Sequence, residues 1–519
     1  MQLILHNIKI NLEDDDPAVY RNLALKKLGA DNLDLQEVKV LKKSLDARDK
    51  NQFYYNLSLL VTVPKTYRNK KRFPQVKKKQ PPFEPTKKLT DRPIIIGFGP
   101  AGIFAALTFI EHGIRPIIFE RGKMIDERLA DITNFEQNKE LDPESNAQFG
   151  EGGAGTYSDG KLTTRIKETG YVAKVLETFI KFGAPENINY LNKPHLGTDK
   201  LCRIIKKIRE QIVKSGGEIN FRSKVTDLII VDGQLKGVEI NYDQKHYSST
   251  IILAIGHSAR DTYQLLHDKG VALEQKPFAV GVRIEHPAAH INLMQYGEKY
   301  QKAPQLDAAD YFLTADNVFS FCMCPGGEII NASSERGHLA LNGMSRAKRN
   351  SAFSNAAIVT KVGTESFGSD HPLAGIEFQR AIEQKAFFDW HAPAQNLTDF
   401  MKGVKSERIR GNSYKMGTVS TELNTILPDF VYNNLVAAFK HWQSRFPFFI
   451  SEKAVLFAPE TRTSSPVRIV RAPERQSVSH ANLYPVGEGS GYAGGITSSA
   501  VDAIKTVEII LETVIAKAE

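Results

Sequence analysis

The stretch from Arg92 to Gly122, RPIIIGFGPAGIFAALTFIEHGIRPIIFERG, constrains the fold of this chain more than any other. Pro93 to Ile96 is a short apolar run without a polar residue, as expected of a strand buried on both faces. A glycine-rich turn follows, then an apolar helix, and then a second apolar run over Pro116 to Phe119. The order of elements is strand, turn, helix and strand, which predicts a parallel α/β unit.

Gly97, Gly99 and Gly102 have the G-x-G-x-x-G spacing of a dinucleotide-binding turn. In such a turn the first glycine permits the tight bend, the second lets a pyrophosphate approach the backbone, and the third lets the helix pack on the strand. Pro100 and Ala101 begin the helix, whose free N–H groups and positive dipole end favour a phosphate. We expect all five residues at a dinucleotide.

Glu120 ends the second apolar run, about 20 residues after the glycines, where an acid typically binds a ribose hydroxyl. Arg121 follows it, and Arg128 is expected one or two turns into the next helix. We predict that these three side chains also contact the cofactor.

The uncharged run from Pro93 to Ile110 also resembles a membrane span that follows a basic segment. Its helical part, however, extends only from Ala101 to about His112, too short for a hydrocarbon core of ~30 Å at ~1.5 Å per residue. We therefore predict no membrane span. The N-terminus lacks a basic region and a small-residue cleavage site, so no signal peptide is predicted.

The three cysteines, Cys202, Cys322 and Cys324, form neither a disulfide framework nor a zinc pattern. No metal site is predicted, and a reducing, cytoplasmic location is expected. If residues 322–324 form a strand, both thiols point to the same face, which suits burial side by side. A redox-active pair is the alternative, although free cysteine is commonly just buried.

The net charge of +9 comes from a single segment. Residues 65–92 contain eleven Lys or Arg and two Asp or Glu, so this segment alone carries +9 and the other 491 residues sum to zero. Its prolines and like charges favour an extended linker over residues 64–91. Binding of nucleic acid or anionic lipid is the alternative, although motifs for base recognition are missing.

Residues 1–63 are predicted to form a small α+β domain with the order βαββ. Alternating apolar residues mark the strands, acids and Pro17 mark a helix start, and Gly29 can end that helix. Between the last two strands, residues 42–50 (KKSLDARDK) are interpreted as a solvated charged turn, with a contact surface as the alternative.

A second glycine-rich segment, SNAQFGEGGAGTYSDGKLTTR, covers residues 145–165. Glycine is costly in a core and is useful where the backbone must approach a ligand. The polar side chains between these glycines favour contact with a bound dinucleotide, which we expect to be at its flavin and pyrophosphate. We expect the cofactor contacts here to be Gln148, Gly152, Gly153, Gly155, Ser158 and Lys161.

Apolar residues at helical spacing predict a helix over residues 197–215, and three strands are expected after it. The first strand, over residues 219–231, has Val225 at its centre, and the third ends in Ala254–Gly256. An A-x-G sequence at a strand end is typical of a backbone that passes a bound dinucleotide, so Val225 and Gly256 are included in the site.

Residues 276–475 lack a second glycine turn after a strand and are predicted to form the substrate domain. Its strand-like runs are 279–284 and 329–332, and its helix-like runs are 376–390 and 432–446. The polar segment PETRTSSPVRIVR includes Glu460, Arg462 and Arg468. These side chains either hold a polar substrate or form an ion-pair network.

The last segment, from Asn482, contains a strand, the turn Gly487–Gly489 and a helix from Gly494. An acid at a strand end before a helix start is typical of flavoproteins. There, Glu488 is expected near the cofactor, and the helix start, with Gly494, Gly495 and Ile496, faces the flavin.

Together these residues resemble the glutathione-reductase-like superfamily of FAD-binding oxidoreductases, and most closely a family of bacterial-type FAD-dependent dehydrogenases. The motifs are GFGPAGIFAAL at 97–107, FGEGGAGTYSDGKL at 149–162, CMCPGG at 322–327, ETRTSSPVR at 460–468 and GEGSGYAGGI at 487–496. One departure is Glu488, where such motifs commonly have Asp.

The resemblance implies bound FAD and an α/β fold with a discontinuous Rossmann-like FAD-binding domain over 89–275 and 476–519. An α+β substrate domain over 276–475 is inserted into it, and the small α+β domain precedes both. The implied function is an FAD-dependent oxidoreductase that transfers hydride through flavin N5, with Tyr492 and Arg462 as candidate proton donors.

A small-molecule substrate and an electron-transfer partner are expected. NADH or NADPH, if used, is expected to bind transiently in the substrate cleft. The alternatives are a flavin monooxygenase, a flavin-linked double-bond reductase, and a nucleic-acid-associated flavoprotein that acts through the basic linker.

Overall fold

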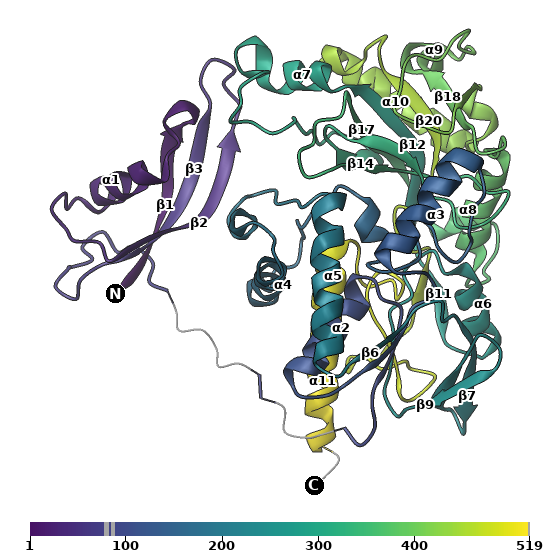
Figure 1. Ribbon diagram of the computed structural model, residues 1–519. Coiled ribbons are helices and arrows are strands. Elements are labelled where there is room, and N and C mark those ends of the chain that lie inside the picture. The colour runs from purple at the N-terminus through teal and green to yellow at the C-terminus, as the bar shows by residue number, and fades with distance from the viewer. Residues whose placement is uncertain (77–82, 85–88, 517–519) are drawn as a thin grey trace.

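The computed structural model describes residues 1–76, 83–84 and 89–516, with the side chains of 513–516 left out. It has a small N-terminal domain that stands to one side of a larger body (Figure 1). The body has two parts, each with its own sheet: a parallel sheet and a larger mixed sheet. The expected mixed α/β class is confirmed.

The N-terminal domain has the predicted βαββ order, and its sheet is antiparallel in the order β1-β3-β2. Asp16 accepts a hydrogen bond from the N–H of Ala18 at the start of the helix, and Gly29 ends it with φ of 72°. The four elements are β1 (Gln2–Asn11), α1 (Pro17–Leu28), β2 (Glu37–Asp46) and β3 (Tyr54–Thr62).

The interpretation of residues 42–50 as a turn is wrong for its first half. Strand β2 continues through Asp46, and Lys43, Ser44 and Asp46 pair with β3. Lys39 and Lys42 stay exposed and Lys43 pairs with Asp15, so charge there does not prevent strand pairing.

The start of the predicted linker is attached to the N-terminal domain. Gln75 forms a bridge with Leu3, and Tyr67 and Phe73 pack against the core of this domain. Residues 77–82 and 85–88, which carry much of the basic charge, lie outside the described part of the chain.

The parallel sheet has the order β22-β10-β4-β5-β6. Its central strand β4 is buried on both faces, as the apolar run predicts. Helices α2 and α11 share one apolar core beside this sheet. The strands are β4 (Ile94–Ile96), β5 (Ile117–Phe119), β6 (Glu218–Asn220), β10 (Ile251–Leu253) and β22 (Leu483–Pro485), and the helices are α2 (Pro100–Glu111), α3 (Ile125–Asn138), α4 (Thr169–Lys181), α5 (Thr198–Lys214), α6 (Arg260–Asp268) and α11 (Ile496–Ala516).

The strand expected over residues 219–231 is divided. Arg222 has φ of 56°, which breaks the extended backbone, so β6 joins the parallel sheet and β7 joins another. The second sheet is antiparallel and gains a strand that was not predicted. Its strands are β7 (Val225–Val231), β8 (Gln234–Ile240) and β9 (Gln244–Tyr247).

The second part of the body is built on a sheet of order β13-β14-β17-β12-β20-β18-β19. Its strands are β12 (Phe278–Pro287), β13 (Thr314–Ala315), β14 (Val318–Cys324), β17 (Phe353–Val362), β18 (Ala392–Asn396), β19 (Thr418–Ser420) and β20 (Val455–Glu460). Its helices are α7 (Ala288–Tyr300), α8 (Ala374–Lys385), α9 (Leu397–Lys402) and α10 (Asp429–Arg445). Two further pairs are β15 (Glu328–Asn331) with β16 (Leu341–Met344), and β11 (Leu273–Gln275) with β21 (Val467–Ile469).

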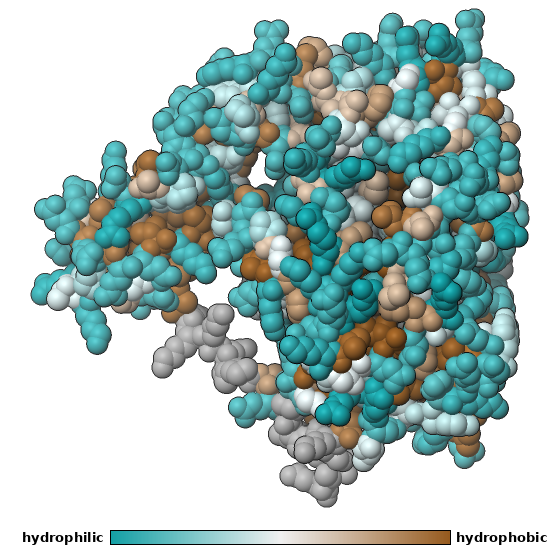
Figure 2. Space-filling model, viewed as in Figure 1, coloured by the Kyte–Doolittle hydropathy of each residue, from teal (hydrophilic) through white to brown (hydrophobic). Residues whose placement is uncertain are grey.

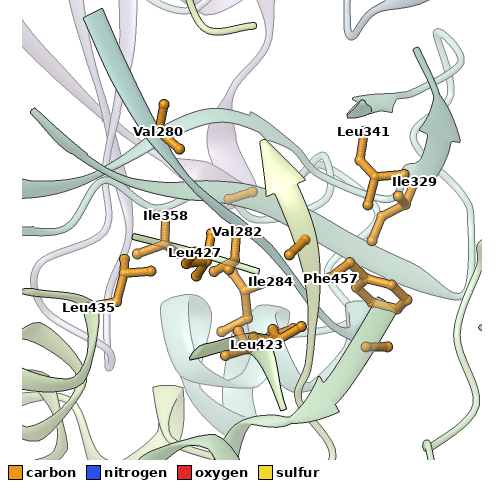
Figure 3. Close-up of a cluster of buried hydrophobic side chains, with 14 of the residues drawn as sticks. Val280, Val282, Ile284, Ile329, Leu341, Ile358, Leu423, Leu427, Leu435 and Phe457 are labelled. Carbon is orange, nitrogen blue, oxygen red and sulfur yellow. The ribbon is translucent and has the colours of Figure 1, made fainter. Parts of the chain in front are cut away.

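The core of this second part lies between the sheet and its helices (Figure 3). Val282 and Ile284 of β12, Ile358 of β17 and Leu435 of α10 are fully buried there. This core gives the cavity described below a rigid wall, because a close-packed interior has low compressibility.

The N-terminal domain contacts the body at one end. Phe53 stacks on Tyr300 of α7 with ring centroids 4.1 Å apart, and Leu12 is buried beside them. Figure 2 shows open gaps between this domain and the body elsewhere along their facing sides. Within the described ranges, no helix combines the length and apolarity that a membrane crossing needs.

Candidate cofactor site

A cavity of about 630 Å³ lies where the parallel sheet meets the second part of the body. Seven segments from distant parts of the sequence form its wall. They are the glycine turn at 97–101, the strand end at 119–121, the glycine-rich segment at 148–163, residues 223–225, the strand end at 254–259, the closing segment at 486–499 and the second-domain wall, which includes Phe321, Cys322, Glu460 and Thr463.

The glycine turn has the packing that its spacing predicts. A Cβ on Gly97 would lie 2.5 Å from the carbonyl oxygen of Ala254, and one on Gly102 would lie 2.0 Å from that of Gly97. Both substitutions are therefore sterically excluded. Gly99 begins α2 without a side-chain cap, so the N–H groups of the first turn are left for a ligand.

The glycine-rich segment meets this turn backbone to backbone. A Cβ on Gly153, whose φ is 62°, would lie 3.0 Å from the Cα of Gly99. A ligand bound here lies against main chain and not against side chains, which suits a pyrophosphate.

Glu120 holds the turn and the glycine-rich segment together. Its carboxylate accepts hydrogen bonds from the N–H groups of Phe98 at 2.7 Å and of Gly122 and Gly150 at 2.9 Å each. It also lines the cavity. The predicted ribose contact stays a prediction, and the carboxylate already has a structural role.

The two arginines after Glu120 are placed differently. Arg121 lines the cavity, forms ion pairs with Glu144 and Asp261, and lies 4.1 Å from the ring centroid of Phe149. Arg128 is fully buried and donates to the carbonyls of Asn146, Glu151 and Gly153. Arg128 therefore shapes the glycine-rich segment from behind.

Most of the predicted cofactor residues line the cavity; Gly102, Arg128 and Gly152 lie behind its wall. A Cβ on Gly152 would lie 2.1 Å from Oγ1 of Thr156, so this glycine serves packing within the segment. Those in the wall are Gly97, Gly99, Pro100, Ala101, Glu120, Arg121, Gln148, Gly153, Gly155, Ser158, Lys161, Val225, Gly256, Glu488, Gly494, Gly495 and Ile496.

Glu488 lies between His257, whose Nδ1 is 3.4 Å from its carboxylate, and the N–H of Gly495 at 3.3 Å. Burial opposes ionisation of Glu488, but the hydrogen bond and charge of His257 together with the Gly495 N–H lower the pKa of the carboxyl below its usual value. A Cβ on Gly494 or Gly495 would meet open space, so this helix start faces the cavity.

The second-domain wall carries a buried ion pair. Nη1 of Arg283 lies 2.9 Å from Oε2 of Glu460, and both side chains are buried. Burial raises the pKa of Glu460 to about 7, although the charge of Arg283 opposes the rise. Glu460 is thus a cavity group that exchanges a proton near neutral pH.

The two predicted proton donors differ in position. Arg462 lines the cavity, and its guanidinium is held by Glu383 at 3.1 Å and by Oγ of Ser334 at 2.7 Å. Tyr492 is 40% exposed, and the guanidinium carbon of Arg471 lies 4.0 Å from the centroid of the Tyr492 ring. Tyr492 lies outside the cavity wall, and both catalytic roles stay predictions.

Four wall residues were not predicted from the sequence. His257, Asn342, Lys361 and Thr463 reach the cavity from the parallel sheet or from the second domain. The available signals were the position of His257 directly after the A-x-G sequence and that of Thr463 within ETRTSSPVR. Asn342 and Lys361 had no local signal, because their position depends on how the two parts pack.

The residues present fit a dinucleotide such as FAD. The N-termini of α2 and α11 both reach the same cavity, and glycines leave the backbone accessible between them. Nε2 of His257 is buried and has no hydrogen-bond partner among the described residues, as expected of a group that awaits a ligand. Fold and site therefore define an α/β protein of the dinucleotide-binding class.

The comparisons specify this class further. Residues 277–463 match the family model described as "FAD-dependent protein, C-terminal domain-like", and residues 1–62 match a domain of unknown function. An uncharacterized protein of Clostridium beijerinckii is 42% identical over 531 residues, covering 99% of both chains. The chain therefore belongs to the same family as this clostridial relative, and its residues 277–463 carry the FAD-dependent domain.

Solved structures resemble the chain only loosely. CtdE in complex with FAD is 12% identical with a TM-score of 0.33, covering 82% of this chain and 84% of its own. A geranylgeranyl bacteriochlorophyll reductase-like protein of Thermoplasma acidophilum is 11% identical with a TM-score of 0.34, covering 82% and 79%.

Proposed function

We propose that the chain is an FAD-dependent oxidoreductase, a dehydrogenase or reductase, whose small-molecule substrate occupies the second-domain part of the cavity. The observation that carries the proposal is that one continuous cavity is lined both by the dinucleotide motifs and by ionisable groups of the second domain. When bound, FAD supplies the redox chemistry as hydride transfer through N5.

The residues of the parallel-sheet part are assigned to binding. The free N–H groups of the first turn of α2 and the backbone at Gly153 receive the pyrophosphate. Glu488 receives a hydroxyl or an ordered water of the cofactor. The start of α11 presents its positive end to the flavin ring, which stabilises negative charge there.

The second-domain wall is assigned to proton handling and to substrate orientation. Glu460 changes its protonation state near neutral pH, and Arg283 fixes the position of its carboxylate. Arg462 presents a cation at the same wall and is proposed to orient a polar or anionic substrate, or to donate a proton to it. Tyr492 is retained as a second proposed donor, although its ring is held outside the wall.

Anaerobic reduction of the purified full-length protein tests the proposal. The protein is expected to retain FAD, or to take it up when FAD is added, and to lose its flavin absorbance when NADH or NADPH is supplied. A screen of oxidants for restored absorbance then identifies the substrate class. Failure to bind FAD under either condition overturns the proposal.

A parallel measurement of dissolved oxygen separates oxidoreductase from monooxygenase. The proposal expects slow oxygen uptake and fast turnover with a particular oxidant. Rapid oxygen uptake coupled to nicotinamide oxidation and to an oxygenated product would place the protein among the monooxygenases instead.

A further inference from the structure

The second-domain wall also holds two cysteines that the proposed function does not use. Cys322 is half-buried and lines the cavity, and Cys324 is fully buried behind it. Both thiols are free. The pair therefore has one member that a ligand in the cavity can reach and one that it cannot.

The backbone at Cys322 is unusual for this residue type. The pairing of β14 with β17 slips between Phe321 and Cys324, and Cys322 has φ of 40°. Such left-handed backbone is unfavourable for a residue with a side chain and occurs often at functional positions. The bulge turns Cys322 towards the cavity, which a regular strand would not do at this register.

Two cations surround the pair. Nζ of Lys161 donates to the carbonyl of Met323, which lies between the two cysteines. Nη2 of Arg283 donates to the carbonyl of Cys322 at 2.6 Å and lies 3.7 Å from Sγ of Cys324. Fixed cations beside a thiol favour its ionised form.

The acids near the pair are already engaged by cations. Asp159 lies 2.9 Å from Nζ of Lys161 and is also paired with Arg349, and Glu460 is paired with Arg283. The hydrogen bond from the Cys324 thiol, followed by the charges of Lys161 and Arg283, lowers the pKa of Cys322 against the effect of burial. The same hydrogen bond and burial raise the pKa of Cys324.

We propose that Cys322 is a nucleophilic site of the cavity that takes soft carbon electrophiles, with Lys161 and Arg283 as the cations beside it and with the Cys324 thiol donating to its backbone carbonyl at 3.5 Å. In this step a bond forms between the Cys322 sulfur and the carbon, and the bond to the leaving group breaks with its electron pair. The sulfur attacks as a thiolate, so no proton has to be removed. This reactivity does not require bound flavin, whereas a role for it in turnover rests on the proposed function.

Alkylation of the full-length, reduced protein by iodoacetamide tests the proposal, with iodide as the leaving group and peptide mass spectrometry as the readout. Cys322 is expected to react before Cys202 and Cys324. Its rate is expected to fall less than threefold from pH 8.5 to pH 6.5, whereas an ordinary thiol with a pKa of about 8.5 slows roughly fifty-fold. Cys202, whose pKa burial raises, is the reference within each sample.

Two variants separate the electrostatic cause from simple exposure. Lys161→Met is expected to make the rate of Cys322 depend on pH as for an ordinary thiol. Lys361→Met removes a cation from the same cavity wall without contact to the pair and should leave the pH profile unchanged. Far-UV circular dichroism and the thermal midpoint establish that each variant is folded.

The proposal fails if Cys322 of the unmodified chain reacts no faster than Cys202, or only in denaturant. It also fails if its pH profile is that of an ordinary thiol. Because the assay needs no cofactor, a protein that binds no FAD but has a reactive Cys322 refutes the proposed function alone. Slower labelling when FAD is added, in turn, places the thiol beside the bound cofactor.

Discussion

At the scale of single residues, Gly99 and Gly153 face each other in the wall of the cofactor site. Both glycines serve close packing, because the backbone of each lies against that of the other. Gly233, in the turn after β7, has positive φ as Gly153 does but has open surroundings. The difference between these two settings makes a direct test possible.

Gly153→Ala is expected to weaken FAD binding at least tenfold and to lower the free energy of unfolding by about 1–3 kcal/mol, the usual cost of a side chain in backbone that only glycine adopts readily. The control Gly233→Ala also places a side chain at positive φ, of 70°, but has no atom within 4 Å of its Cβ. It should show a similar loss of stability and an unchanged FAD affinity. Titration by flavin fluorescence and urea unfolding measure the two quantities, and equal affinities in both variants would contradict the assignment.

Glu285 supplies a prediction about pH. Burial raises its pKa from 4.5 to about 7, against hydrogen bonds from the N–H and Oγ of Ser413. The folded chain therefore holds a proton that the unfolded chain releases between these values, so the free energy of unfolding falls as pH rises through this window.

Glu285→Gln is expected to remove part of that fall, on the order of 1–3 kcal/mol between pH 5 and pH 7.5. The rest of the fall should persist in this variant, because the pKa of Glu460 is also raised to about 7. Urea unfolding across this range, with the exposed Glu407→Gln as control, measures the slope. A variant as steep as the unmodified chain would show that Glu285 does not hold the proton.

The sequence predicted glycine positions better than side-chain roles. Turn geometry depends on local backbone, so Gly97, Gly99 and Gly102 could be interpreted from their spacing alone. Arg128 carried no such signal, because whether an arginine faces a ligand or buries itself under a loop depends on packing. Its fully buried guanidinium was therefore expected in the cavity and lies behind it.

At the scale of elements, helix α8 is connected to α6 and to the segment after β20 by a buried ion network. Glu383 accepts from Arg260 at 2.8 Å and from Arg462 at 3.1 Å, and all three side chains are buried. Burial opposes ionisation of Glu383, but the two guanidinium groups hold its pKa far below the usual range. The network fixes the second-domain wall against the parallel-sheet part.

Glu383→Gln should destabilise the protein by about 3–5 kcal/mol, because it leaves the buried Arg462 without a carboxylate partner and leaves Arg260 with Glu335 alone. Glu377→Gln on the same helix removes the largely exposed partner of Arg380 and should cost less than about 1 kcal/mol. Thermal and urea unfolding give both values. Similar small losses in the two variants would mean that the buried network contributes little to the folded state.

Elements with strong periodicity were predicted well, and interrupted ones were not. The amphipathic helix expected over 197–215 corresponds to α5, Thr198–Lys214. The strand expected over 219–231 is divided by the left-handed backbone at Arg222, a conformation that arginine rarely adopts and that no local pattern predicts. Charge likewise misled the interpretation of β2, whose pairing extends past Lys43.

At the scale of the whole molecule, the N-terminal domain is connected to the body through the aromatic contact of Phe53 with Tyr300 and through backbone hydrogen bonds of Lys43 with Tyr190 and Asn192. The cavity lies among other elements, and the residues of this domain are not part of its wall. Docking of the domain and cofactor binding are therefore expected to be independent.

Tyr300→Ala should increase the radius of gyration in small-angle scattering and change the FAD affinity less than twofold. Tyr247→Ala, at an exposed position of β9, controls for loss of a tyrosine and should change neither quantity. A large loss of FAD affinity in Tyr300→Ala would instead show that the domain supports the site.

The order of domains along the chain could be inferred from composition and motifs, but their contacts could not. Phe53 and Tyr300 are 247 residues apart, and neither stands in a motif. Contacts of this kind depend on the shape complementarity of two folded surfaces. The periodicity of residues within one helix or strand does not encode it.

Strand β22 lies at the edge of the parallel sheet, beside β10, so this sheet can be completed only late in the synthesis of the chain. Until residues 483–516 have left the ribosome, β10 has one unpaired edge and α2 lacks the apolar helix α11 that covers it. The glycine turn lies within the first fifth of the chain, but the cofactor site is closed only when the last segment has been added. A ribosome-bound chain should hold FAD only once residues 483–516 are outside the ribosome, and a chain that lacks them should present an open strand edge on which other chains can aggregate.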